Sequence, residues 1–128
     1  MLNKKELSTY APIVTRISIS LVFLWFGINQ IINYEKFISY LPDLLLLSSY
    51  TKELILFNGI FELIFGTLLI IGLFTRFVSF ILSLHLLSIA ISLGYNDIAI
   101  RDLGLTLVTF SIFLGGSDKW CLDFKKDT

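Results

Sequence analysis

Residues 54–74 read LILFNGIFELIFGTLLIIGLF, and this stretch decides the fold. It is apolar along nearly its whole length and holds a single charged residue, Glu62. An α-helix of about 20 apolar residues is long enough to cross the hydrocarbon core of a bilayer, which is roughly 30 Å thick. The stretch therefore predicts a membrane-spanning helix with one carboxylate inside it.

The composition of the whole chain agrees with a membrane protein. Of its 128 residues, 55% are hydrophobic and only 16% are charged, and the mean hydropathy is +0.83. A soluble domain has about 25% charged residues. The formal net charge is zero, so nothing points to a nucleic-acid partner. We expect residues 1–128 to form one integral membrane domain.

Three further apolar stretches complete the predicted topology. The sequence predicts spans at about residues 12–32, 54–74, 77–94 and 98–114. The turn between the second and third spans is short and forces those helices to run antiparallel. These observations predict an all-α, up-down four-helix bundle in the membrane.

Residues 33–53 separate the first two predicted spans. They mix aromatic and charged side chains with the short apolar run 44–47. Four apolar residues cannot span a membrane, and aromatic residues beside charges suit the headgroup layer. We expect a short interfacial helix or a re-entrant turn here.

The basic residues predict the orientation. One side of the bundle would carry both termini and seven basic residues, and the other side would carry three. The seven are Lys4, Lys5, Arg16, Arg76, Lys119, Lys125 and Lys126, and the three are Lys36, Lys52 and Arg101. Cytoplasmic loops carry an excess of Lys and Arg, so we expect the N and C termini to be cytoplasmic.

Glu62 is predicted to face the interior of the bundle. Asn58, Gly59, Glu62 and Gly66 fall on one helix face by their three- and four-residue spacing. Small residues allow membrane helices to approach closely, and an isolated carboxylate in lipid costs several kcal/mol. The carboxylate could be a structural group in a protonated or paired state, or it could be a proton or ligand site.

The depths of the other polar residues predict a pocket in the outer half of the bundle, with candidate residues Glu62, Arg101, Asp102, Gln30 and Asn29. Arg101 and Asp102 lie early in the fourth span, and Asn29 and Gln30 end the first. We expect Arg101 to neutralise Glu62, with both amides as hydrogen-bond support. No metal is expected there.

His85 and Arg16 are weaker candidates. His85 lies near mid-membrane and shares a helix face with Ser88 and Ser92. It could be a neutral histidine bonded across helices, or it could donate a hydrogen bond to a quinone carbonyl. Arg16 lies in the cytoplasmic half, where we expect it to snorkel to the surface or to pair near it. One histidine and one cysteine, Cys121, are too few for a metal or haem site built by this chain alone.

Several motifs together resemble those of DoxX-like membrane proteins. They are RISISLVFLWFG at 16–27, ELIFGTLLIIGLFTR at 62–76, RDLGLTLVTFSIFLGG at 101–116 and WCLD at 120–123. Their order and spacing cover the chain from about residue 15 to residue 123. The resemblance implies a small four-helix membrane protein.

The resemblance also implies a function. The family is named for a subunit associated with a thiosulfate- or quinol-linked oxidoreductase, so we expect a membrane subunit of a quinone-linked redox complex, at most a non-metal subunit of the enzyme. Quinone is the expected ligand, and membrane redox proteins are the expected partners. A non-catalytic scaffold or assembly factor is the alternative, a small-solute transporter is a third reading, and a homo-oligomer is left open.

Overall fold

The protein folds into four long α-helices. The computed structural model describes residues 3–40, 49–93 and 96–124. In chain order its elements are α1 (Lys4–Ile32), the 3-10 helix η1 (Tyr34–Tyr40), α3 (Thr51–Ile71), α4 (Thr75–Leu93) and α5 (Asp97–Gly115). Each α-helix is long and apolar enough to cross a membrane, and the described ranges contain no β-strand. The predicted all-α bundle of four membrane spans is confirmed.

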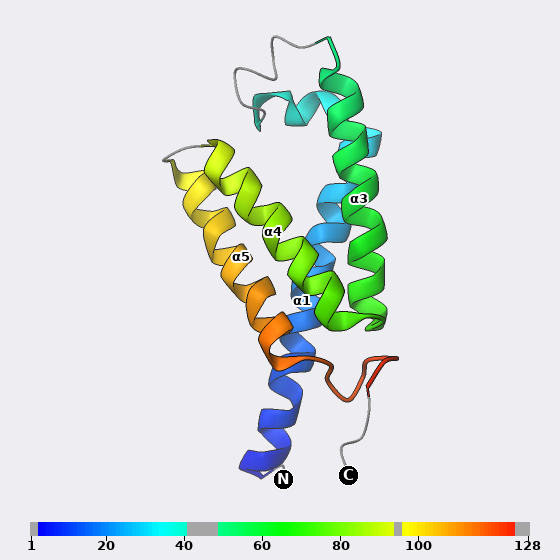
Figure 1. Cartoon of the computed structure of the whole chain (residues 1–128), viewed down its shortest axis with the longest axis vertical. Helices are drawn as coiled ribbons and strands as arrows, with labels where there is room; N and C mark the ends of the chain where they lie inside the picture. Colours follow the sequence, from blue (N-terminus) through cyan, green and yellow to red (C-terminus); the bar gives the residue numbers. More distant parts are fainter. Residues whose placement is uncertain (1–2, 41–48, 94–95, 125–128) are drawn as a thin grey trace.

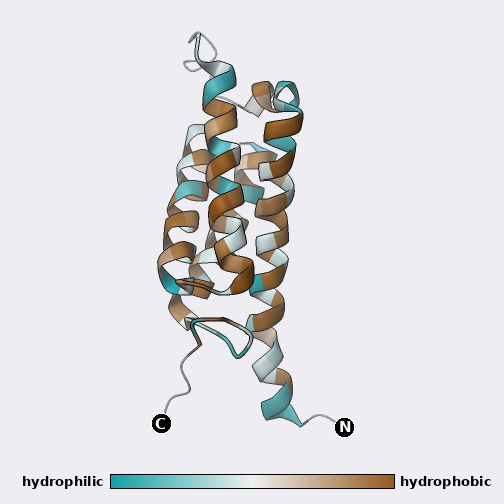
Figure 2. Ribbon diagram, turned by 90° about the vertical axis from the view of Figure 1, so that its right-hand side faces the viewer, coloured by the Kyte–Doolittle hydropathy of each residue, from teal (hydrophilic) through white to brown (hydrophobic). Residues whose placement is uncertain are grey.

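The helices run up and down, so the bundle has two distinct ends. Figure 1 shows the start of α1, the α3–α4 turn and the segment after α5 at one end, which we call the terminal end. η1 lies at the opposite end, which we call the η1 end. Hydrophobic residues cover most of the length of the helices, while hydrophilic residues gather toward the two ends (Figure 2). This distribution is the one that a bilayer requires of an integral membrane protein.

α1 begins eight residues earlier than predicted, at Lys4 instead of Pro12. The Asn3 side chain accepts a hydrogen bond from the Glu6 backbone N–H at 2.9 Å, and the Glu6 carboxylate accepts one from the Asn3 N–H at 2.9 Å. This reciprocal capping box fixes the start of the helix. Pro12, the first residue of the predicted span, therefore lies inside α1.

The second and third spans also meet at a different point from the one predicted. α3 ends at Ile71 because Gly72 takes the left-handed conformation, with φ 76°, that terminates many helices. Phe74 follows with φ 54°, and α4 begins at Thr75. Because of the Gly72 cap, α3 ends before residue 74, its predicted end, and α4 begins before residue 77, its predicted start. Residue 94, the predicted end of the third span, lies outside the described residues.

The fourth span and the interfacial segment agree more closely with prediction. α5 covers Asp97–Gly115, within one residue of the predicted 98–114. Asn96 caps it by accepting a hydrogen bond from the Ala99 N–H at 2.8 Å. η1 is the short helix expected between the first two spans, and residues 41–48 of that segment lie outside the described residues.

The bundle consists of two closely packed helix pairs, α1 with α3 and α4 with α5. Glycines bring the first pair together: a Cβ added to Gly59 would lie 2.9 Å from Gln30 Cβ and 3.0 Å from the Gly27 carbonyl oxygen. The two pairs diverge toward the η1 end (Figure 1). Toward the terminal end they meet through a buried cluster that we call the apolar layer: Ile19, Phe23, Leu69, Val78, Leu82, Leu86 and Ile112.

The segment after α5 folds back across the terminal end. The Leu122 and Asp123 N–H groups donate to the Ile71 and Gly72 carbonyls at 3.1 and 3.0 Å. These are carbonyls that the end of α3 leaves without helical partners. The segment 116–124 thus closes the bundle on the side opposite η1.

Candidate functional site

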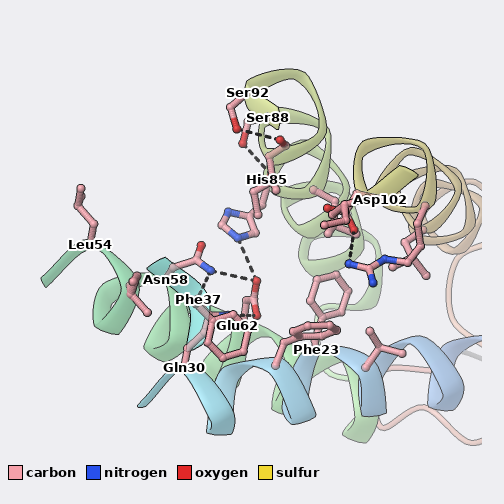
Figure 3. Close-up of a pocket in the computed structure, with 18 of the residues that line it drawn as sticks. Phe23, Gln30, Phe37, Leu54, Asn58, Glu62, His85, Ser88, Ser92 and Asp102 are labelled. Atoms are coloured by element: carbon pink, nitrogen blue, oxygen red, sulfur yellow. Dashed lines mark hydrogen bonds and ion pairs between the residues drawn. The ribbon is translucent and has the colours of Figure 1, made fainter. Parts of the chain in front are cut away.

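A cavity of about 340 Å³ lies between the two helix pairs in the half of the bundle nearer η1. All four helices and η1 contribute to its walls, which are largely aliphatic and aromatic. Its polar lining residues are Gln30 from α1, Asn58 and Glu62 from α3, His85, Ser88 and Ser92 from α4, and Arg101 and Asp102 from α5. Figure 3 shows how these side chains converge.

Glu62 is the centre of the polar wall. Its side chain is buried, in agreement with the prediction that Glu62 faces the interior of the bundle. Gln30 Nε2 donates to Oε2 at 2.9 Å, and Asn58 Nδ2 donates to Oε1 at 3.2 Å. Asn58 Nδ2 also reaches Gln30 Oε1 at 2.7 Å, so one amide orients the other. This network fixes the carboxylate between α1 and α3, and hydrogen bonds from two amides offset part of the cost of burying it.

His85 approaches the same carboxylate from α4. Its Nε2 atom lies 3.4 Å from Glu62 Oε1, but this buried atom has no hydrogen-bond partner among the described residues. The imidazole ring packs against the ring of Phe61, with the centroids 4.6 Å apart. A buried ring nitrogen without a hydrogen bond is uncommon in proteins. Here the nitrogen points at the Glu62 carboxylate (Figure 3), with which it could exchange a proton.

Arg101 and Asp102 line the opposite wall. Asp102 is buried, whereas the Arg101 side chain is about half exposed and its Nη2 lies 3.5 Å from Asp102 Oδ1. The guanidinium also lies over the ring of Phe26, 5.9 Å from the centroid. The predicted Arg101–Glu62 pair is therefore wrong, because Arg101 pairs with its own neighbour at the edge of the cavity. The groups that approach Glu62 are Gln30, Asn58 and His85.

Asn29 does not belong to the cavity. Its Nδ2 donates to the Trp25 carbonyl at 2.7 Å, and the contact is exposed. Its neighbour Gln30 points inward because adjacent helical residues face about 100° apart. Of the five predicted pocket residues, four line the cavity and Asn29 lies outside it.

A second polar centre occupies the terminal half of the bundle. Arg16 is almost completely buried, and its Nε donates to Asp118 Oδ2 at 2.7 Å while Nη2 reaches Oδ1 at 3.3 Å. Its Nη1 donates to the carbonyls of Leu69 and Ile70 at the end of α3. The alternative that Arg16 snorkels to the surface is wrong. The alternative that it pairs near that surface is confirmed, with Asp118 as the partner.

Asp118 was missed in the sequence because it lies beyond the last span, where an acidic residue suggests only a solvated tail. The Gly115-Gly116 pair before it allows the chain to turn back under the bundle. Gly116 has φ 77°, a conformation that glycine adopts without strain. That turn brings the carboxylate beside α1 at Arg16, although the two residues lie 102 positions apart in the chain.

Asp123 and Cys121 complete the closure of the terminal end. The Asp123 carboxylate accepts from the Thr75 N–H at 2.7 Å, the Thr75 hydroxyl at 3.0 Å and the Ser117 hydroxyl at 2.6 Å. Partial burial opposes ionisation, but these hydrogen bonds outweigh it and hold the pKa of Asp123 below its usual range. Burial raises the pKa of the Cys121 thiol, which packs against Gly72. Cys121 is a packing residue here.

The residues that the structure describes contain no cluster of three or more His, Cys, Asp and Glu side chains that could hold a metal ion. The site is a mostly apolar cavity lined by a carboxylate, an imidazole and two amides, inside a small multi-pass membrane protein.

Comparison with known families agrees with this class of protein. The model of the DoxX family matches residues 11–94, about two thirds of the chain. The chain belongs to the DoxX family. Comparisons with curated proteins and with solved structures gave no significant match.

Proposed function

We propose that this protein is a membrane subunit of a quinone-linked oxidoreductase complex, and that its cavity receives the head group of the quinone. The observation that carries the proposal is the pair of the buried Glu62 carboxylate and the partly buried His85 ring, 3.4 Å apart in a mostly apolar cavity, with His85 Nε2 making no hydrogen bond to any described residue.

The size and lining of the cavity fit such a ligand. Small-molecule sites are mostly apolar, with a few placed polar groups, and measure about 300 to 1,000 Å³. A volume of about 340 Å³ accommodates one substituted ring, while an isoprenoid tail would extend into the lipid. Phe23, Phe26 and Phe37 supply flat apolar walls.

The chain's own residues have distinct proposed roles. The His85 imidazole, which lines the cavity, would donate a hydrogen bond to a carbonyl oxygen of the ligand. Glu62 would hold a proton near that oxygen, and Gln30 and Asn58 keep the carboxylate in position. A quinone supplies the capacity to accept electrons together with protons. The electrons would come from a partner subunit, for which membrane redox proteins are the candidates.

Binding is tested by thermal unfolding of the purified protein in detergent with a short-chain quinone. A ligand present at about 100 times its Kd stabilises the native state by about 2.7 kcal/mol. We expect this stabilisation in the wild type and its loss in Glu62→Gln, which keeps the size of the side chain. Asp97→Asn makes the same chemical change on an exposed residue outside the cavity and should behave as the wild type does.

The alternative scaffold function predicts a different result. Glu62 would then serve only to join α1 and α3, and Glu62→Gln would change the unfolding temperature with no effect of quinone in either protein. Absence of quinone-dependent stabilisation in the wild type would reject the proposal. Gentle detergent extraction from the native membrane, followed by identification of co-purifying proteins, tests the complex itself.

We also propose that both termini face the cytoplasm, because the terminal end carries the larger number of basic residues. The η1 end and the cavity would then lie toward the outer face. Protease access to the exposed N-terminal residues in intact and inverted vesicles tests this orientation. Cleavage only in inverted vesicles is expected, and cleavage only in intact vesicles would reject it.

A further inference from the structure

The cavity is closed toward the terminal end by the apolar layer. Residues of this layer lie between the polar cavity residues and the terminal end: Ile19 and Phe23 precede Gln30 on α1, and Leu82 precedes His85 on α4. Leu69 and Ile112 take the same place on α3 and α5. A proton that left Glu62 toward the terminal end would have to cross this fully buried hydrocarbon.

Hydroxyl groups near this layer do not bridge it. Ser20, Ser79 and Thr109 are buried, but each donates its hydroxyl hydrogen to a carbonyl of its own helix, at 2.7, 2.7 and 2.8 Å. A hydroxyl bonded in this way satisfies itself locally. A separate hollow of about 250 Å³ at the terminal end reaches Asp118 but shares no lining residue with the cavity.

Toward the η1 end the cavity has a polar mouth. Ser88 and Ser92 line it and are exposed, and they follow His85 along one side of α4 (Figure 3). Both donate to carbonyls of their own helix, so their oxygen lone pairs can accept from water. Ser92 lies one residue before the end of α4, and Arg101 from α5, half exposed, lines the same cavity.

We infer that the Glu62–His85 pair is a proton-binding site that exchanges with the aqueous phase at the η1 end only, through the mouth formed by Ser88 and Ser92. The other charged groups that face this site are Asp102 and Arg101 from α5. The groups nearest it from α1 and η1, Gln30 and Phe37, do not titrate. The inference deepens the proposed function by naming the side of the membrane from which protons reach the cavity. It rests on the proposed function only in taking quinone reduction as the use of these protons.

The test uses the fact that His85 is the only histidine. Diethyl pyrocarbonate modifies the neutral imidazole and not the protonated one, so its rate in the full-length chain, purified with a tag free of histidine, reports the protonation of this residue. The protein is reconstituted in liposomes of phosphatidylcholine and phosphatidylglycerol without quinone. The pH is then lowered on one side while the other side stays buffered. A cysteine introduced at exposed Lys36 or at exposed Lys119, beside the buried native Cys121, is labelled with a membrane-impermeant maleimide and gives the orientation.

Lowering the pH on the η1 side should slow the modification severalfold, and the same change on the terminal side should leave the rate unaltered. A rate that follows the terminal side, both sides or neither side would overturn the inference. Because no quinone is present, this result is independent of whether quinone binds.

Cysteine substitution supplies a second, independent readout. Ser88→Cys and Ser92→Cys should react with the impermeant maleimide from the η1 side. Ser79→Cys, the matched control on the same helix, is buried behind the apolar layer and should react from neither side, as should the buried native Cys121. Failure of both mouth cysteines to react, or reaction of Ser79→Cys, would contradict the one-sided route.

Discussion

At the scale of single residues, the effect of replacing His85 distinguishes a ligand-binding role of this residue from a structural role. A histidine that stabilises the bundle through hydrogen bonds should be costly to replace, whereas removal of an unbonded buried nitrogen is neutral or stabilising. His85→Phe keeps a flat ring against Phe61 and removes both nitrogens. We expect an unfolding temperature equal to or above that of the wild type, together with loss of quinone-dependent stabilisation. Thermal unfolding with and without quinone measures both, and a clear loss of stability without ligand would indicate a structural role.

The Arg16–Asp118 pair should show the opposite behaviour. Removing one member of a buried ion pair leaves the other charge without a partner and typically costs about 3–5 kcal/mol. We expect Asp118→Asn to destabilise the protein by an amount in this range, while Lys119→Ala, at an exposed neighbour, should change stability by less than about 0.5 kcal/mol. Reversible unfolding in mixed micelles gives the values.

A double-variant cycle checks that the effect belongs to the pair. Arg16→Gln with Asp118→Asn should cost less than the sum of the two single changes, because the residues are in contact. Additive costs would show that Arg16 acts mainly through the carbonyls of Leu69 and Ile70.

The sequence predicts on which face of its own helix a residue lies, but not how the neighbouring helices are rotated toward that face. The inward orientation of Glu62 could be inferred, because Gly59 and Gly66 share its helix face and lipid excludes a carboxylate. The partner of Glu62 could not be inferred, because the depth of a residue in the membrane says nothing about the rotation of its helix about the helix axis. Arg101 has a suitable depth, but it turns to the edge of the cavity, whereas His85 points at the carboxylate from α4.

At the scale of helices, glycine contacts hold α1 against α3. A methyl group at Gly59 would come within 3.0 Å of atoms on α1, whereas one at Gly104 would meet nothing within 4 Å. Overpacking of this kind costs about 1–3 kcal/mol. Gly59→Ala should therefore destabilise the protein by such an amount, and Gly104→Ala should be neutral or stabilising because alanine favours helix. Equal effects of the two changes on the unfolding temperature would contradict the packing.

The start of α4 should respond to acid through Asp123. Its pKa is lowered in the folded state, so the stability that it contributes is complete above the pKa of the unfolded chain, about 3.9. That contribution is lost as the pH falls through the lower, folded value. We expect the unfolding temperature to fall below about pH 4, and Asp123→Asn to lower it at neutral pH and to flatten its dependence on pH in that window. An unchanged pH profile in the variant would show that other groups control acid unfolding.

Helix boundaries were less predictable than helix number. Hydropathy specifies four spans, because each must provide a bilayer-length apolar stretch. The ends depend on local signals outside those stretches. The Asn3–Glu6 capping box extends α1 into a polar segment, and Gly72 ends α3 within an apolar run.

At the scale of the whole molecule, two polar centres lie in opposite halves of the bundle, with the apolar layer between them. The Arg16–Asp118 centre is saturated with contacts and anchors the segment after α5. The Glu62–His85 centre lines a cavity and keeps one nitrogen unbonded. The first has the properties of a structural lock, whereas the second has an open volume beside it, which is why we propose that the function belongs to the half nearer η1.

The most direct measurement of this assignment is the amount of quinone that remains bound after gentle extraction from the native membrane. The wild type and Asp97→Asn should retain quinone in similar molar ratio to protein, as measured by chromatography of the extracted lipids, and Glu62→Gln should retain only background. Equal retention in all three proteins, or none in the wild type, would contradict the account.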